Sequence, residues 1–359
     1  MLALAYLHSA GFTHKDLKKL FEIEENYEEI YGLCISGKAL STPWITIERK
    51  TKILENLKTL DVWKIGKIIQ EKNIELITLH DERYPEKLRT IKQAPYMLYV
   101  RGDLHEERKM LGIVGSRKST SYGKKVLEKI IPELIQSGCW VVSGGAYGID
   151  AISHEITLAH GGYTISVFGC SVDILYPAQN IRLFENILKL WGALVSIFPI
   201  GTKAESYMFP IRNEVVAALS DGIIIPEAGI KSGTLITAGL ALEHGRDVFA
   251  VPGDIFRETS EWTNQLIARW EAKCIKSASD ILEDYFPNMS MTPTSLFSQK
   301  EFASEEQKII YSAISEWYDT PDTLGQNTDY TIDTIIMTLA LLEMDWHIRL
   351  SSSGRYEIL

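Results

Sequence analysis

The sequence has few cysteines and no long apolar run. Its cysteines lie far apart and form no C-x-x-C pair; they are Cys34, Cys139, Cys170 and Cys274. This spacing excludes a zinc ribbon or a C-x-x-C redox site and is typical of small buried side chains in a reducing compartment. No apolar run approaches the roughly 20 residues of a membrane helix, and the N-terminus lacks the basic start of a signal peptide. We therefore expect a cytoplasmic protein that binds neither a metal nor a membrane.

The chain also lacks the excess of positive charge that phosphate binding usually requires. Its formal net charge at pH 7 is −10. Residues 1–110 are nearly neutral, residues 111–285 carry 15 basic and 19 acidic side chains, and residues 301–359 carry 3 basic and 11 acidic ones. Most of the acidity therefore lies near the C-terminus. A nucleic-acid site in the middle of the chain is compatible with this composition if cations gather there.

Length and periodicity predict three domains. A chain of 359 residues exceeds what one hydrophobic core usually serves. Residues 1–79 show short amphipathic helices, and residues 80–286 alternate apolar strands with helical segments. Residues 287–300 have the composition of a linker. Residues 301–359 show helices followed by a closing hairpin, which predicts a winged-helix domain.

The middle domain is predicted to be a doubly wound α/β fold. Its strands are continuous apolar runs, mostly bounded by Gly or Pro and separated by helical patterns. This pattern is typical of a parallel sheet that helices cover on both faces, as in Rossmann-like domains. The predicted strands are Leu111–Gly115, Cys139–Ser143, Thr164–Gly169, Ala193–Ile197, Gly222–Pro226 and Asp247–Val251.

The loop after the first of these strands gathers positive charge. Ligands of open α/β sheets bind beyond the carboxyl ends of the strands. Gly115 and Ser116 are small enough for the backbone to approach an anion, and Arg117 and Lys118 follow them directly. Residues 117–125 hold four cations and no acid. The alternative is a solvated loop that leads into a helix.

The loop after the second strand is rich in glycine. Ser143, Gly144 and Gly145 lie at a strand-to-helix turn, which favours phosphate binding. The spacing is not G-x-G-x-x-G, and no acid ends the next strand to bind a ribose hydroxyl, so a dinucleotide site is not favoured. We interpret Asp150 as a helix cap or first-turn acid.

Two further loops are predicted on the same edge of the sheet. Phe209 precedes an Arg-Asn pair, and this combination suits a nucleic-acid strand whose bases stack while its phosphates need several donors. Phe209 as a plain core residue fits the sequence equally well. The Arg-Asn pair is Arg212 and Asn213, and the loop after the fifth strand contains Ser232, Gly233 and Thr234. The small-residue loops after the first, second and fifth strands lie on one edge of the sheet and together predict an anion-binding groove.

Catalytic motifs are scarce. His154 and His160 do not share a helical face, and the sequence contains no H-E-x-x-H, no G-x-S-x-G and no Walker lysine. We interpret both histidines as surface or core residues. The sequence therefore predicts a binding protein without a cofactor and not an enzyme.

Short motifs follow one another in a fixed order along the chain. They are G-S-R at 115–117, S-G-G at 143–145, G-I-D at 148–150, Y-P at 176–177, F-P at 209–210, R-N at 212–213, S-G-T at 232–234, I-T-A at 236–238 and D-V-F-A-V-P-G at 247–253. This series resembles the bacterial DNA-processing protein A (DprA/Smf) family. The resemblance covers essentially the whole chain and is strongest at residues 74–285.

The resemblance implies a single-stranded-DNA-binding protein that protects incoming DNA and helps to load the RecA recombinase during natural transformation. It also implies a homodimer formed through the Rossmann-like domain and a sterile-alpha-motif-like fold for the N-terminal helices. In the family, the residues that match Arg117, Phe209 and Arg212 contact DNA.

Three positions depart from the basic pattern of the family: Ser206, Tyr147 and Glu214 stand where a basic residue is common. If these departures weaken the site, Lys118, Arg182 and Lys231 are the cations expected to compensate.

Two other functions stay open at the level of sequence. The fold also resembles cytokinin-activating nucleoside-monophosphate phosphoribohydrolases, whose P-G-G-x-G-T-x-x-E loop supplies a catalytic glutamate. The comparable stretch at residues 229–237 ends in Thr237 and lacks that glutamate. A nucleotide-sensing module without DNA is the third interpretation.

The C-terminal domain is not expected to bind duplex DNA. Its second predicted helix carries Asp333, Glu343 and Asp345 but no Lys or Arg, so phosphates are repelled. We interpret this domain as a protein-contact or regulatory module.

Overall fold

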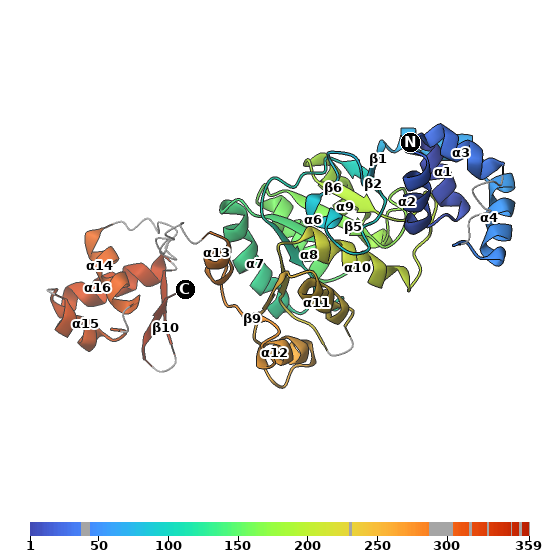
Figure 1. The fold of residues 1–359 in the computed structure, drawn as a ribbon. Helices are drawn as coiled ribbons and strands as arrows, with labels where there is room; N and C mark the ends of the chain where they lie inside the picture. Colours follow the sequence, from blue (N-terminus) through green and yellow to red (C-terminus); the bar gives the residue numbers. More distant parts are fainter. Residues whose placement is uncertain are drawn as a thin grey trace. The chain divides into compact units, whose positions relative to one another are not determined.

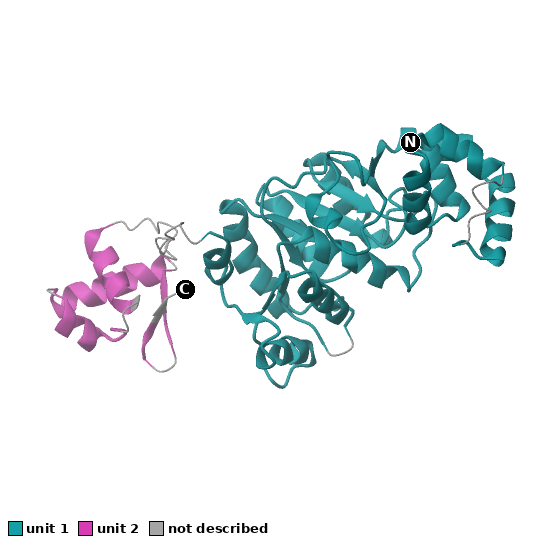
Figure 2. Cartoon of the chain, viewed as in Figure 1, with its two compact units in different colours: residues 1–289 teal, residues 290–359 magenta. Residues whose placement is uncertain are grey.

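The structure is a computed structural model that describes residues 1–36, 44–229, 232–286, 304–315, 318–328, 330–345, 347–351 and 354–358. The chain divides into two compact units, residues 1–289 and residues 290–359 (Figure 2).

The described residues of the N-terminal part of the first unit form five α-helices, which lie together in Figure 1. Local capping defines several of their starts. Thr13 forms a capping box with Asp16 at the second helix, and Asp61 accepts hydrogen bonds from the first turn of the fifth. The helices are α1 (Leu2–Ala10), α2 (His14–Ile23), α3 (Tyr27–Ile35), α4 (Ile47–Thr59) and α5 (Val62–Glu71).

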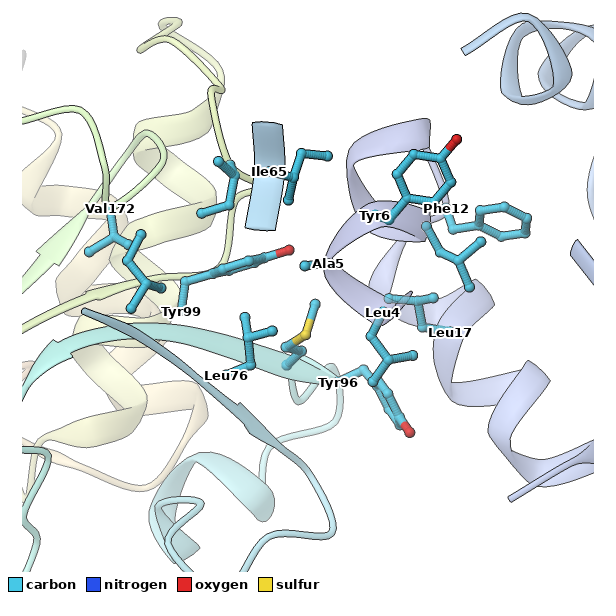
Figure 3. Packing of buried hydrophobic residues seen from close by; sticks show 14 of the residues in the cluster. Leu4, Ala5, Tyr6, Phe12, Leu17, Ile65, Leu76, Tyr96, Tyr99 and Val172 are labelled. Carbon is cyan, nitrogen blue, oxygen red and sulfur yellow. The ribbon is translucent and has the colours of Figure 1, made fainter. Parts of the chain in front are cut away.

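These helices share a hydrophobic core with one edge of the large sheet. Leu4 and Ala5 of α1 belong to the same buried cluster as Leu76 and Tyr99 of the sheet (Figure 3). A hydrogen bond of 3.0 Å joins the ring nitrogen of the buried His8 to the hydroxyl of Tyr99. The helices and the sheet therefore form one continuous core, which explains why they lie in a single unit.

The sheet of the first unit has nine strands in the order β1-β2-β6-β5-β4-β3-β7-β8-β9. The pairs from β6 to β9 are parallel, while β2 pairs antiparallel with β6 and β1 with β2. The strands are β1 (Ile74–Thr78), β2 (Met97–Gly102), β3 (Met110–Ile113), β4 (Trp140–Ser143), β5 (Thr164–Phe168), β6 (Ala193–Ser196), β7 (Gly222–Ile225), β8 (Asp247–Ala250) and β9 (Lys273–Cys274).

The predicted Rossmann-like α/β architecture is therefore confirmed, and each of the six predicted strands falls on one of β3 to β8. The sheet begins earlier in the chain than residue 80, where the sequence placed the start of this domain. Because β1 pairs along its whole length with β2, the segment 74–78 is part of the sheet.

Helices cover both faces of the sheet. Side chains of α7, α8 and α13 form one buried cluster with β3 and β4, and side chains of α10, α11 and α12 form another with β5, β6 and β7. The helices are α6 (Glu86–Arg89), α7 (Ser121–Gln136), α8 (Ile149–Ala159), α9 (Ile181–Lys189), α10 (Met208–Leu219), α11 (Thr234–Glu243), α12 (Glu261–Ala268) and α13 (Ser279–Tyr285), with the 3₁₀ helices η2 (Ala178–Asn180) and η3 (Glu258–Ser260).

The strand order reverses between β3 and β7. From β3 the chain moves outward through β4, β5 and β6, then returns to the other side of β3 with β7 and β8. The loops that follow β3 and β7 therefore leave the same edge of the sheet in opposite directions. Such a topological switch point opens a crevice at the carboxyl ends of the strands.

In the second unit, the described residues form three helices and a hairpin: α14 (Glu305–Ser315), α15 (Pro321–Asn327), α16 (Ile332–Met344), β10 (Ile348–Leu350) and β11 (Tyr356–Ile358). The sequence indicated the first and last of these helices and the hairpin. It missed α15, which is short and starts at Pro321 behind a capping box of Thr320 and Thr323. The structure leaves the predicted winged-helix class of this unit untested.

One cysteine differs from its predicted environment. Cys34, Cys139 and Cys170 are buried free thiols, but Cys274 is exposed, because β9 is a two-residue strand at the edge of the sheet. No helix among the described residues has the length and apolar composition to cross a bilayer. In the same residues, no group of three His, Cys, Asp or Glu side chains is placed to hold a metal ion.

Candidate nucleic-acid interface

A cleft of about 1050 Å³ lies at the switch point of the sheet. Its walls come from the loop after β3, the start of α10, the loop after β7 and the start of α12. The predicted site residues that line it are Gly115, Ser116, Arg117, Lys118, Phe209, Arg212, Asn213, Ser232, Gly233 and Thr234. A smaller adjoining recess shares Arg117, Phe209 and Arg212 with the cleft and adds Gly144 and Gly145.

Two predicted residues that the structure describes, Ser143 and Arg182, are not part of this lining. Ser143 is fully buried, and its hydroxyl donates a 2.6 Å hydrogen bond to the carbonyl of Ile113, so it stabilises the sheet and cannot contact a ligand without rearrangement. Arg182 is exposed on α9 and lines neither cavity. Lys231 lies outside the described residues.

The loop after β3 presents two exposed cations. Arg117 and Lys118 are both exposed, and neither forms an ion pair with any residue that the structure describes. Ser116 shapes this turn, because its hydroxyl donates to the carbonyl of Lys118 and accepts from the amide of the same residue. Of the other cations in this stretch, Lys124 pairs with Glu128 along α7 at 3.6 Å. Lys125 is exposed on the same helix, so Arg117 and Lys118 are the cations of the loop itself and the ones that line the cleft.

Glu227 anchors this loop to the next one, a role that sequence reasoning missed. Its buried carboxylate accepts hydrogen bonds of 2.7 Å from both the amide and the hydroxyl of Thr120, the N-cap of α7. Its backbone carbonyl accepts from the amide of Ser116 at 3.0 Å. Gly123 is required beside it, because a Cβ there would lie 2.6 Å from the carboxyl carbon. An acid directly after an apolar strand was the available signal.

Arg212 lies inside the protein rather than on its surface. Only 4% of the residue is exposed. Its guanidinium donates hydrogen bonds to the backbone carbonyls of Gly144 and Val167, and its Nε donates to the side chain of Asn213 at 3.1 Å. Gly144 must lack a side chain, because a Cβ there would lie 2.5 Å from the guanidinium carbon. Arg212 thus ties α10 to the loop after β4 and to the end of β5.

A buried carboxyl group lies near this guanidinium. Asp150 occupies the first turn of α8, as the sequence suggested, and accepts a 3.3 Å hydrogen bond from the amide of Ala146. Burial raises the pKa of Asp150, while the positive charges of Arg212 and Arg117 act in the opposite direction. Burial likewise lowers the pKa of Arg212, and the charge of Asp150 opposes that shift. Each group therefore limits the cost of burying the other.

Phe209 lies between the two arginines. Its ring centroid is 5.0 Å from the guanidinium carbon of Arg117 and 5.8 Å from that of Arg212. The ring is half-buried and rests over Gly169, where a Cβ would lie 2.7 Å from the ring. Tyr176, tilted by 37° at 6.3 Å, adds a second aromatic ring. The arrangement offers a partly exposed aromatic surface beside a free cation, which suits a stacked base and its phosphate.

The loop after β7 contributes small polar groups. The hydroxyls of Ser232 and Thr234 lie 2.7 Å apart, and the amide of Thr234 donates to Ser232. The same cleft is also lined by two exposed acids at the start of α12, Glu258 and Glu261. The cleft is therefore electrostatically asymmetric, and a phosphate backbone is favoured along Arg117 and Lys118.

The two histidines lie outside the cleft lining. His154 is fully buried, its ring nitrogen lies 2.7 Å from the hydroxyl of Thr164, and burial lowers its pKa to about 3. His160 is exposed, and its ring Nδ1 lies 2.9 Å from the carbonyl oxygen of Ile156 near the end of α8. Their interpretation as core and surface residues is confirmed.

Comparison with known proteins decides the family. The family model described as DNA recombination-mediator protein A matches residues 75–286. The chain belongs to this family. It is 39% identical over 217 residues to the DNA processing protein DprA of Bacillus subtilis (strain 168), which is 60% of this chain and 72% of that protein. It is 33% identical over 282 residues to the DprA of Streptococcus pneumoniae (strain ATCC BAA-255 / R6), which is 78% of this chain and 96% of that protein. The DprA/Smf resemblance predicted from the motifs is confirmed.

Solved structures of the family share the fold. DNA processing protein A from Streptococcus pneumoniae superimposes with a TM-score of 0.66 at 30% identity, covering 79% of this chain and 98% of that one. DNA processing protein A from Helicobacter pylori, whose structure was described for its single-stranded-DNA-binding mode, gives a TM-score of 0.54 at 29% identity, covering 60% of this chain and 98% of that one. Both support the Rossmann-like assignment.

Proposed function

We propose that this protein binds single-stranded DNA, protects incoming strands and helps to load RecA recombinase during natural transformation. The observation that carries the proposal is the switch-point cleft, where the exposed Arg117 lies 5.0 Å from the partly exposed ring of Phe209. Family membership and the single-stranded-DNA binding described for the Helicobacter pylori relative support it.

The cleft suggests how the strand is held. Phosphates lie against Arg117 and Lys118, and a base stacks on Phe209. Because neither contact reads a base edge, the protein binds with little sequence preference. Affinity falls as salt rises, because phosphate contacts release counterions.

We assign Arg212 a positioning role in this site. Its Nη1 group donates to the carbonyls of Gly144 and Val167 and its Nε group to Asn213, so the side chain holds the loop after β4 close to the ring of Phe209. Its Nη2 group makes no hydrogen bond with a described residue and Arg212 lines the cleft, so a phosphate contact from Nη2, as the family pattern implies, adds to those of Arg117 and Lys118.

We propose that the cleft binds without catalysing a reaction and needs no cofactor. The carboxyl groups in its lining are Asp150, Glu258 and Glu261. Asp150 is buried and hydrogen-bonded in the first turn of α8, and the two glutamates are exposed at the start of α12. The glutamate of the phosphoribohydrolase loop is replaced by Thr237, a buried residue of α11. A nucleotide-binding or phosphoribohydrolase-like function is the competing hypothesis.

The remaining assignments rest on the family. We propose a homodimer formed through the Rossmann-like domain, a cytoplasmic location, a sterile-alpha-motif-like N-terminal domain and a winged-helix C-terminal domain. RecA is proposed as the protein partner that receives the bound strand.

Fluorescence anisotropy with a labelled single strand of about 35 nucleotides tests the DNA proposal. Arg117→Ala should weaken binding about tenfold and reduce the slope of log affinity against log salt by about one phosphate contact. Arg269→Ala is the matched control, because Arg269 is exposed at the end of α12 and does not line the cleft. Equal binding of duplex and single strand would count against the proposal.

Two further measurements separate the competing functions. A mononucleotide that displaces the single strand at low concentration, or release of free base from a nucleoside monophosphate, would favour the nucleotide-binding or hydrolase hypothesis. RecA loading is tested by adding the protein to RecA and single-stranded DNA and following the DNA-dependent ATPase of RecA, which should start sooner with wild type than with Arg117→Ala.

A further inference from the structure

The last helix of the second unit is apolar on two faces. Its inner face is buried against α14 and β10 and consists of Ile335, Thr338, Leu339 and Leu342. The opposite face is exposed and presents an apolar stripe that runs over the last three turns. We call the following residues the outer stripe: Ile336, Met337, Ala340, Leu341 and Met344.

This exposure is large for residues of this type. Met337 is 68% exposed and Met344 is 75% exposed, although both lie within or at the end of a regular helix. A helix that is apolar around its whole circumference is normally buried on all sides, and contiguous exposed apolar patches mark interaction surfaces. The unbranched, flexible methionines suit a surface that adapts to another helix.

Charge indicates what covers the outer stripe. Asp333 lies at the start of the helix on the exposed side, and Glu343 and Asp345 flank the stripe near its other end. Residues 301–359 carry 11 acidic and 3 basic side chains, and two of those basic residues, Lys308 and Arg355, are paired with acids within the unit. A nucleic acid is repelled by this surface, and a second copy of the same surface would bring two strongly acidic units together.

We propose that the outer stripe of α16 is a docking surface for an amphipathic helix of a partner protein, with an apolar face flanked by Lys and Arg. The apolar ridge of that helix packs against the outer stripe, while its cations face Asp333, Glu343 and Asp345. The unit then works as a protein-recruiting module in addition to the proposed DNA site and does not depend on that site.

The test uses the full-length protein and a fluorescent peptide of about 18 residues, with leucines at helical i, i+3, i+4 and i+7 spacing and lysines on both flanks. Two comparison peptides carry glutamate in place of lysine, or the same composition in scrambled order. We expect the full-length protein to bind the basic amphipathic peptide and to bind each comparison peptide at least about tenfold more weakly.

The decisive variant is Met337→Ser/Met344→Ser, which removes apolar surface without changing charge. It should weaken peptide binding about tenfold or more, while single-stranded-DNA binding and the thermal unfolding curve stay unchanged. Ile47→Ser/Trp63→Ser is the matched control, because these residues of the first unit are 83% and 86% exposed. The control should bind the peptide as wild type does.

Three outcomes would overturn the proposal. They are no binding of the basic peptide by wild type, equal binding of the scrambled peptide, and unchanged binding by the stripe variant. Sedimentation velocity adds a fourth outcome: a wild-type dimer that dissociates in Met337→Ser/Met344→Ser would assign the outer stripe to a second copy of the chain. Loss of DNA binding by wild type would refute the proposed function and leave these results unaffected.

Discussion

The two arginines beside Phe209 belong to regions that use positive charge in opposite ways. In the loop after β3, Arg117 is exposed and forms no ion pair with a described residue. At the start of α10, Arg212 is 4% exposed and donates to two backbone carbonyls. Both lie within 6 Å of the same ring, at 5.0 and 5.8 Å. The two guanidinium groups are therefore similarly close to the ring but differ in how many of their donors the protein itself holds.

The difference in exposure between the two arginines follows from the hydrogen bonds of each region. In the loop after β3, the bonds between Glu227 and Thr120 fix the backbone, so the side chains of Arg117 and Lys118 face solvent. The start of α10 lies over the turn after β4, where Gly144 leaves room for a guanidinium group and presents a carbonyl to it. The loop after β3 therefore exposes its positive charge to solvent, whereas the start of α10 uses its guanidinium group to link two segments of the protein.

The largest expected difference between the two regions is in stability. Arg212→Ala should lower the free energy of unfolding by about 3 kcal/mol, because it leaves two buried carbonyls without a donor and Asp150 without its nearby cation. Arg117→Ala should change that free energy by less than about 0.5 kcal/mol, since the side chain is exposed. Urea unfolding followed by circular dichroism measures both. An equal loss of unfolding free energy in the two variants would refute the structural role assigned to Arg212.

A smaller effect is expected at the ring that the two regions share. Phe209→Leu keeps most of the apolar volume but removes the aromatic face, so single-stranded-DNA affinity should fall about fivefold to tenfold. Its free energy of unfolding should change by less than about 1.5 kcal/mol. Phe209→Tyr keeps the face and should bind nearly as wild type does. If leucine and tyrosine behaved alike in the anisotropy assay, the ring would be a packing residue and not a stacking surface.

The smallest expected effect is a difference in pH dependence. Burial raises the pKa of Asp150, and burial together with the charge of Arg212 lowers the pKa of His154 to about 3. Removing Arg212 raises both pKa values, so the native state of Arg212→Ala binds more protons than wild type in mildly acidic solution. Protons bound by the native state stabilise it as the pH falls, and the native variant binds more of them than native wild type does. The difference in free energy of unfolding between wild type and Arg212→Ala should therefore shrink by about 1 kcal/mol between about pH 7 and about pH 4.5.

Unfolding curves of both variants and of wild type at several pH values measure this effect. Arg117→Ala should show a smaller change than Arg212→Ala, because Arg117 is the lesser of the two charges that act on Asp150. A deficit that stays constant with pH would show that Arg212 does not interact with Asp150 and His154.

The predictable part of the site came from residue types in loops. Continuous apolar runs located six parallel strands, and the loops after them contained Gly115, Arg117 and Ser232, which the structure brings to one cleft. Ser143 and Cys274 were misplaced, because burial depends on which strands become neighbours and on where the sheet ends. Glu227 was missed, because its partner Thr120 lies more than a hundred residues earlier in the chain.

The sequence by itself determined the α/β class, the order of the strands along the chain, the family and the cationic loop after β3, because each of these depends on short-range patterns. Only the tertiary structure decided that Arg117 is exposed and Arg212 is bonded to backbone carbonyls, and that acids line the same cleft. It also decided that α16 keeps an apolar face in solvent. These properties depend on neighbours far away in the chain, which periodicity and composition do not encode.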